Sequence, residues 1–257
     1  MSGPSLAEVR ATGQPPHVLA RLNDEHWAGR LYMRRVSPYA TVAFARLGWS
    51  PNAVTVAFMV SGVAAGLVAA IPGLAAALGV ALLIQLYLLL DCSDGELARF
   101  TGRTSATGIY LDRMGHYIAE AVLLGGLGVR AQGHFTLAGS YVSIGLAAAV
   151  CATLIKAETD LVTVARASYG LHGAHDDRAL SPRSQGLARA RRLAAALGLH
   201  RIIQAPELSI LILAAAIADA AGGGLTATRV LDVAALAVGA VMTVAHLVTI
   251  VASRRLR

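Results

Sequence analysis

Six stretches of the chain are long and apolar enough to cross a membrane, and they limit its possible folds more than any other feature. A helix needs about 20 apolar residues to cross the hydrocarbon core of a bilayer. The stretches cover residues 51–71, 73–94, 105–128, 136–158, 206–222 and 227–252. Hydrophobic residues make up 56% of the chain and charged residues only 14%, which is unlike an ordinary soluble domain. The sequence therefore predicts an all-α integral membrane protein with six transmembrane helices.

The segment before the first span predicts a helix that lies on the membrane surface. Trp27, Tyr32, Tyr39, Phe44 and Trp49 alternate with arginines at a spacing that suits an amphipathic helix. An irregular tether is the alternative. The chain then divides into a cytoplasmic N-terminal segment with this surface helix, a six-helix membrane domain and a basic cytoplasmic tail, at residues 1–50, 51–252 and 253–257. The first 35 residues hold no apolar core segment, so we expect no cleavable secretory signal.

The distribution of basic residues predicts the orientation, because Lys and Arg gather on the cytoplasmic side. With the N-terminus inside, the outer loops hold only Arg130 and Arg229 of the 22 basic residues. An even number of spans returns the C-terminus to the cytoplasm as well. Abundant arginine and alanine are typical of a GC-rich bacterial genome, so we expect the bacterial inner membrane.

An acidic stretch interrupts the apolar sequence between the second and third spans. Residues 88–117 read LLLDCSDGELARFTGRTSATGIYLDRMGHY. Asp91 and Asp94 are three residues apart, and Asp112 and His116 are four apart, so each pair shares one helix face. A ten-residue linker holding Gly102 would make the two helices antiparallel neighbours. We therefore expect four potential ligands in one cleft that opens to the cytoplasm.

Three carboxylates this close repel one another unless a cation compensates their charge. Asp oxygens favour hard divalent ions such as Mg²⁺, Mn²⁺ or Ca²⁺. Small residues at Gly95, Ala98 and Gly108 would let a phosphorylated ligand approach the helix backbone. A metal ion held by carboxylates beside an arginine is typical of sites for phosphoryl transfer. In such sites, positioning of the substrate and neutralisation of its charge provide most of the catalysis.

The spacing of these residues resembles the signature of a known family. The pattern Asp91-x2-Asp94-Gly95-x2-Ala98-Arg99-x8-Gly108-x3-Asp112-x3-His116 is similar to that of the CDP-alcohol phosphotransferases. Seven of the eight signature positions match, and the eighth, the family's fourth aspartate, corresponds to His116. A weaker similarity is Pro51-Asn52 with Thr55 at the entry to the first span.

The resemblance implies that an acceptor alcohol attacks the phosphate on the alcohol side of a CDP-alcohol, with CMP as the leaving group. It implies one or two Mg²⁺ or Mn²⁺ ions, CDP-diacylglycerol as the default donor, contact with membrane lipids, a homodimer and no nucleic-acid partner. The implied site residues are the metal ligands Asp91, Asp94, Asp112 and His116, the catalytic pair His116 and Asp112, and the nucleotide-binding residues Asn52, Asp94, Gly95, Ala98, Arg99 and Gly108.

His116 leaves three hypotheses open. An imidazole can serve as the base that takes the acceptor's proton or as a metal ligand, and either role supports a working enzyme. Alternatively, the chain is a pseudoenzyme that binds CDP-linked ligands without turnover. A third possibility is a small transporter in which the carboxylates and His116 relay protons.

An arginine cluster between the fourth and fifth spans is a candidate site for the phosphate of an anionic acceptor. Its members in this hypothesis are Arg191, Arg192 and Arg201. Contact with anionic lipid head groups is the competing interpretation.

Overall fold

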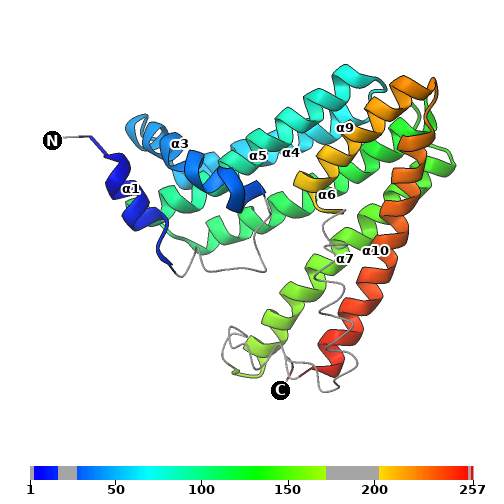
Figure 1. Cartoon of the computed structure of the whole chain (residues 1–257). Helices are drawn as coiled ribbons and strands as arrows, with labels where there is room; N and C mark the ends of the chain where they lie inside the picture. The colour runs from blue at the N-terminus through cyan, green and yellow to red at the C-terminus, as the bar shows by residue number, and fades with distance from the viewer. Residues whose placement is uncertain (1–2, 17–27, 172–202, 254–255, 257) are drawn as a thin grey trace.

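The computed structural model describes residues 3–16, 28–171, 203–253 and 256, and the regular elements within these ranges are helices (Figure 1). In chain order they are α1 (Leu6–Gly13), the π-helical turn η1 (Gly29–Met33), α3 (Arg34–Arg46), α4 (Pro51–Ala69), α5 (Leu74–Thr101), α6 (Ala106–Gln132), α7 (Ser140–Ser168), α9 (Ala205–Gly222) and α10 (Thr226–Ala252).

Among the described residues, five helices have the length and apolar character needed to cross a membrane: α4, α5, α7, α9 and α10. They identify the chain as an integral membrane protein and confirm the all-α prediction. Helix α6 has 27 residues and is long enough to span, but polar and charged side chains such as Asp112, His116 and Glu120 interrupt its apolar sequence. The count of six spans, the orientation and the type of membrane stay predictions.

Short sequence signals set the ends of the helices that build the site. Ser50 caps α4 by accepting a hydrogen bond from the Ala53 amide at 3.2 Å, and Pro51 occupies the first turn. Ser105 caps α6 in the same way through the Gly108 amide at 3.0 Å. Gly102 ends α5 with a φ of 66°, a left-handed conformation that glycine adopts without steric cost.

The predicted ten-residue linker after the second span is wrong, because α5 continues to Thr101 and only four residues, 102–105, separate it from α6. A helix of 28 residues is about 42 Å long, whereas the hydrocarbon core is about 30 Å thick. The last turns of α5 can therefore leave the apolar layer without unwinding. Gly95, Ala98 and Arg99 consequently lie on a continuous helix and point in directions that the helix fixes.

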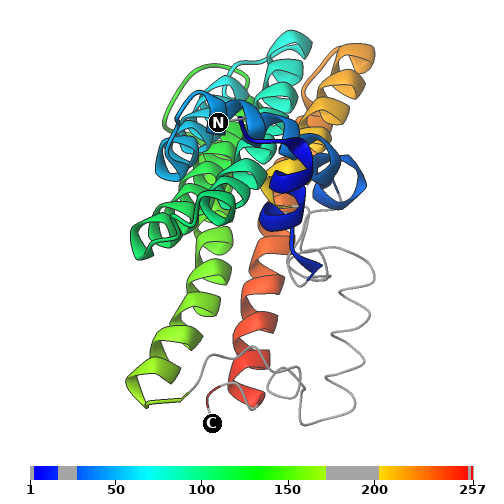
Figure 2. The same ribbon diagram turned by 90° about the vertical axis from the view of Figure 1, so that its left-hand side faces the viewer.

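Helices α4, α5 and α6 pack closely together, and α7 and α10 run side by side away from them (Figures 1 and 2). Glycines allow the closest approaches. A Cβ atom added at Gly126 of α6 would lie 2.1 Å from the carbonyl oxygen of Gly66 on α4. A Cβ at Gly145 of α7 would lie 2.7 Å from the carbonyl oxygen of Leu124 on α6. Small residues at such crossings are how membrane helices gain packing contacts.

The N-terminal helices α1 and α3 pack on α5, at the end of the bundle where α5 turns into α6 (Figure 1). One face of α3 is buried through Ser37, Pro38 and Thr41, while Val36 and Tyr39 are exposed. This two-sided character is compatible with the predicted surface helix, whose position on a membrane stays a prediction. Trp27, which belonged to that prediction, lies outside the described residues.

Candidate active site

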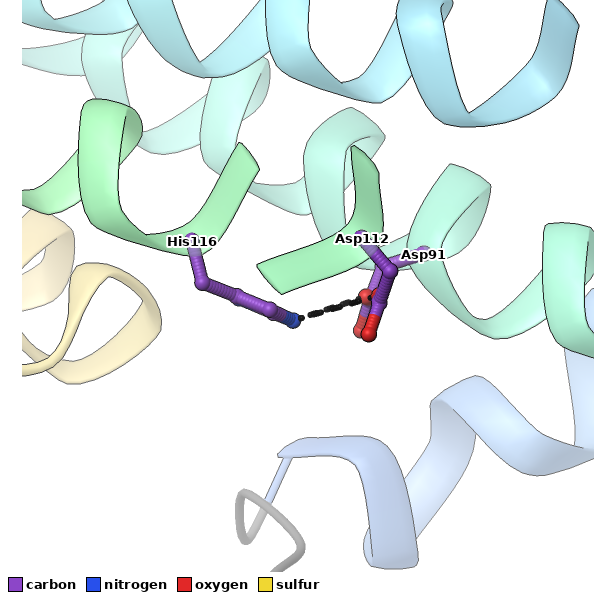
Figure 3. A group of neighbouring side chains, drawn as sticks. All are labelled: Asp91, Asp112 and His116. Atoms are coloured by element: carbon purple, nitrogen blue, oxygen red, sulfur yellow. Dashed lines mark ion pairs between the residues drawn. The ribbon is translucent and has the colours of Figure 1, made fainter. Parts of the chain in front are cut away.

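Asp91 on α5 and Asp112 and His116 on α6 bring their side chains together. Nε2 of His116 lies 3.2 Å from Oδ1 of Asp91 and 3.6 Å from Oδ1 of Asp112. Figure 3 shows the three side chains converging from the two neighbouring helices. These three residues, which sequence analysis placed on two separate helices, therefore meet in one cluster. The antiparallel packing of the two helices brings them together.

The donor set of this cluster fits a divalent cation. Asp91, Asp112 and His116 each offer one ligand atom, and the three atoms lie within 4.8 Å of one another. Carboxylate oxygens suit Mg²⁺ and Mn²⁺, and imidazole nitrogen is acceptable to Mn²⁺ and other transition metals. All three residues are partly exposed, so an ion can reach them.

Asp94 lies in the same cavity but is held differently. Its carboxylate is buried, and Oδ2 accepts a hydrogen bond of 2.6 Å from Thr55 Oγ1 on α4. It is not one of the three residues whose ligand atoms cluster, so its predicted role as a metal ligand stays a prediction. This hydrogen bond links α4 to the acidic end of α5, so Thr55 has a structural role at the contact between the two helices.

A cavity of about 540 Å³ opens beside the cluster. The predicted site residues Asn52, Asp91, Asp94, Gly95, Ala98, Arg99, Gly108, Asp112 and His116 all line it. Arg34 and Arg103 add two further positive charges to the wall. A cavity of this size, whose wall holds both acids and arginines, can hold a ligand that carries both phosphates and a bound cation.

The small residues keep part of the wall open. A Cβ added at Gly108 would lie 3.2 Å from Oδ1 of Asn52, and one at Gly95 would lie 3.1 Å from the Arg99 guanidinium. These distances are tight, so larger side chains would push Asn52 or Arg99 aside. The glycines therefore allow a ligand to approach the backbone of α5 and α6 while Asn52 and Arg99 keep their places.

Arg99 joins the cavity to the N-terminal helix α1. Its Nε donates a hydrogen bond of 2.7 Å to the carbonyl oxygen of Gly13, at the last residue of α1. An arginine near a helix C-terminus satisfies a carbonyl that has no partner within the helix. The contact fixes the Nε edge of the Arg99 guanidinium, a group that sequence analysis treated only as nucleotide-binding.

Two buried residues of α5 were missed by sequence analysis, one beside His116 and one that faces α1 and α3. Tyr87 is 1% exposed, and its hydroxyl lies 2.5 Å from Nδ1 of His116. Glu96 is fully buried and accepts hydrogen bonds from Gln14, Ser37 and Thr41. The sequence did hold a signal for Tyr87, since it lies one helical turn before Asp91 and therefore on the same face.

Other charged groups on α6, α7 and α10 are engaged in pairs away from the cavity. Lys156 Nζ lies 3.2 Å from Glu120 Oε1, and His246 Nδ1 lies 2.9 Å from Glu158 Oε2. Their pairing explains how charged side chains are tolerated among apolar helices. The predicted acceptor residues Arg191, Arg192 and Arg201 lie outside the described residues.

Comparison with known proteins gives a partial relative. No protein-family model matches the chain. Over 83 residues the chain is 45% identical to archaetidylinositol phosphate synthase of Aeropyrum pernix. The matched region is 32% of this chain and 40% of the relative, so the chain covers less than half of the relative's length. About a third of the chain is thus similar to part of a protein named as a synthase of archaetidylinositol phosphate.

Proposed function

We propose that the protein transfers a phospho-alcohol group, with phosphatidyl as the first choice, from a CDP-alcohol to the hydroxyl of an acceptor alcohol and releases CMP. The observation that carries this proposal is the cavity, because one space is lined by the acids, the small residues and the arginine of the signature together with His116. The similarity to a phospholipid synthase over part of the chain supports the same class of reaction.

Different residues of the cavity bind the nucleotide and the divalent ion in this proposal. Asn52, Gly95, Ala98, Arg99 and Gly108 bind the CMP part of the donor. Asp91 and Asp112, with Asp94 beside them, hold one or two divalent ions. Such an ion supplies positive charge to the pyrophosphate oxygens, whose negative charge grows as the bond to CMP breaks.

The bond changes are a displacement at phosphorus. The acceptor oxygen bonds to the phosphorus that carries the donor alcohol, and the bond from this phosphorus to the bridging oxygen breaks. CMP leaves with that oxygen and its electron pair, and the acceptor's proton moves to Nε2 of His116. Because one lone pair cannot bind an ion and accept a proton at the same time, the base role leaves ion binding to the carboxylates.

The name of the relative guides the choice of acceptor. We propose a phosphorylated inositol as the first acceptor to test, with unphosphorylated inositol, glycerol phosphate and serine as comparisons. CDP-diacylglycerol remains the default donor, and the active site is proposed to face the cytoplasm.

The test is product analysis by mass spectrometry with purified protein, Mg²⁺ or Mn²⁺, CDP-diacylglycerol or another CDP-alcohol, and the acceptor panel. The expected result is CMP together with a new phosphodiester that depends on both substrates. Glu158→Gln is a matched control, since Glu158 pairs with His246 and does not line the cavity. Absence of CMP with every donor and acceptor, combined with measurable binding of a CDP-alcohol, would favour the pseudoenzyme.

A further inference from the structure

We propose that the end of α1 belongs to the nucleotide site, where the carbonyl oxygen of Gly13 holds Arg99 in place to bind the CMP part of the donor. The inference rests on the proposed function, which assigns Arg99 to that part of the donor. Gly13 does not line the cavity and does not touch substrate in this proposal. It is a positioning residue that acts through Arg99.

The two ends of the Arg99 guanidinium face different parts of the structure. Nε donates a hydrogen bond of 2.7 Å to the Gly13 carbonyl oxygen, at the last residue of α1. NH1 and NH2 lie over Gly95, since a Cβ added there would lie 3.1 Å and 3.5 Å from them. Gly95 and Arg99 both line the cavity. The Nε edge is therefore held by α1, while the terminal nitrogens lie at the cavity wall.

Holding Arg99 before the ligand arrives raises the affinity of the site. A long arginine side chain loses rotamer freedom when a ligand immobilises it, and this loss lowers affinity. The bond to Gly13 restricts the side chain in the free protein. The negative end of the α1 helix dipole attracts the guanidinium to the same place. A lysine at position 99 would have a single nitrogen, which could not serve α1 and a ligand from two separate edges.

The Gly13 carbonyl is in position only while α1 is packed on α5. A helix of eight residues is marginal on its own in water. Gly13 permits close packing, because a Cβ there would lie 3.2 Å from Glu96 Cβ and 3.3 Å from the Glu96 carbonyl oxygen. The Gln14 side chain donates to Glu96 Oε1 at 2.8 Å and to the Arg34 carbonyl oxygen at 2.7 Å. Docking of α1 therefore decides whether Arg99 has this acceptor.

The competing interpretation is that α1 only fastens the N-terminal segment to the bundle. In that case the bond between Gly13 and Arg99 adds stability, and ligand binding at the cavity is independent of α1. The two interpretations differ in whether a change at Gly13 alters nucleotide affinity through Arg99.

The first test measures the affinity for CMP in Mg²⁺ by calorimetry in detergent. Gly13→Leu places a side chain against Glu96 and moves the end of α1 off α5. It should weaken CMP binding about three- to tenfold, the effect of immobilising one long side chain on binding. Ala11→Leu is the matched control, since Ala11 is an exposed residue of the same helix, and it should stay within twofold of the wild type. Wild-type affinity in Gly13→Leu would overturn the inference.

A double-mutant cycle shows whether the effect passes through Arg99. In an Arg99→Lys background, Gly13→Leu should change the affinity for CMP by less than twofold, because the lysine has no Nε edge for α1 to hold. Equal losses in the two backgrounds would show that α1 acts through general packing and would overturn the inference.

The second test needs no substitution in α1. If docking of α1 favours nucleotide binding, nucleotide binding must favour docking of α1 by the same factor. Saturating CMP with Mg²⁺ should therefore slow hydrogen exchange of the amides in residues 5–14 of the wild type about three- to tenfold. In Arg99→Lys at saturating CMP the change should be less than twofold. Unchanged exchange in the wild type would overturn the inference even if Gly13→Leu failed to fold.

Binding and turnover separate this inference from the proposed function. If the wild type binds CMP in a manner that depends on Gly13 but releases none from any donor, the proposed function fails and the inference stands. If CMP is released and Gly13→Leu keeps the wild-type affinity, the inference fails and the proposed function stands. Absence of CMP binding by the wild type would overturn both.

Discussion

Glu96 accepts a hydrogen bond of 2.8 Å from Thr41 Oγ1, and its carboxylate is fully buried between α5 and α3. Ser37 donates to the same carboxylate at 2.6 Å, and Gln14, just after α1, donates at 2.8 Å. Arg34 NH1 lies 3.6 Å away and lines the cavity. One buried acid therefore fastens both N-terminal helices to α5 beside the site.

Glu96→Ala should detach α1 and α3 from the bundle. The substitution leaves three hydrogen-bond donors and Arg34 without their shared acceptor, and breaking a buried charged cluster on one side destabilises by about 3–5 kcal/mol. Thermal unfolding in detergent and limited proteolysis of the N-terminal segment measure the effect. Glu8→Ala is the control, because Glu8 is an exposed acid that caps α1 through Ser5. Equal proteolysis of the two variants would contradict the role of Glu96.

The carboxylates that meet at His116 should be needed for turnover but not for folding. Asp91→Asn and Asp112→Asn each remove a negative charge that holds the ion, so we expect CMP release to fall at least about 100-fold. Insertion, expression and melting temperature should stay close to those of the wild type, since both side chains are partly exposed. CMP release is measured beside the Glu158→Gln control, and activity within twofold of the wild type would refute the assigned roles.

The five apolar helices of membrane-spanning length and the cluster of Asp91, Asp112 and His116 could be read from the sequence, because each rests on local spacing. Apolar runs of about 20 residues locate membrane helices, and residues three or four apart share a helix face. Ser105, which sequence analysis placed at the start of the third span, is indeed the N-cap of α6. The common cavity followed from a short connection between two antiparallel helices.

The contacts that depend on how helices rotate against one another could not be read in the same way. Glu96 is a single acid on α5, and its partners Gln14 and Thr41 lie 82 and 55 residues away. No spacing rule pairs residues at such distances, because tertiary packing decides which faces meet. The extension of α5 to Thr101 was missed because hydropathy marks where the apolar layer ends and not where the helix ends.

Replacement of His116 should separate its two candidate roles. His116→Ala should lower CMP release by about 100-fold or more, the usual contribution of a general base. The affinity of the His116→Ala variant for Mn²⁺, measured by electron paramagnetic resonance without substrate, should stay within threefold of the wild-type affinity. A much weaker affinity for Mn²⁺ would show that Nε2 is an ion ligand. Wild-type CMP release by His116→Ala would show that His116 is neither the base nor an ion ligand.

His116→Asp should bind Mn²⁺ more tightly than the wild type. The substitution adds a negative charge within reach of Asp91 and Asp112, and opposite charges at this range attract strongly in a partly buried site. The variant should still release CMP, because a carboxylate can also take the acceptor's proton. The same Mn²⁺ titration provides the measurement, and unchanged or weaker binding would show that residue 116 lies too far from the ion to influence it.

Gly126→Ala should disturb the crossing of α4 and α6, while Gly125→Ala should not. The added Cβ at Gly126 would lie 2.1 Å from the Gly66 carbonyl oxygen and 3.1 Å from Ala69 Cβ, so the helices must move apart. Overpacking of this kind destabilises by about 1–3 kcal/mol. At Gly125 the new methyl would meet only Leu146 Cδ2, at an ordinary 3.6 Å. The two variants differ by one position on the same helix and add the same atoms. Thermal unfolding in detergent should therefore show a lower melting temperature for Gly126→Ala alone. Equal melting temperatures of the two variants would mean that α4 and α6 pack less closely than the backbone contact at Gly66 indicates.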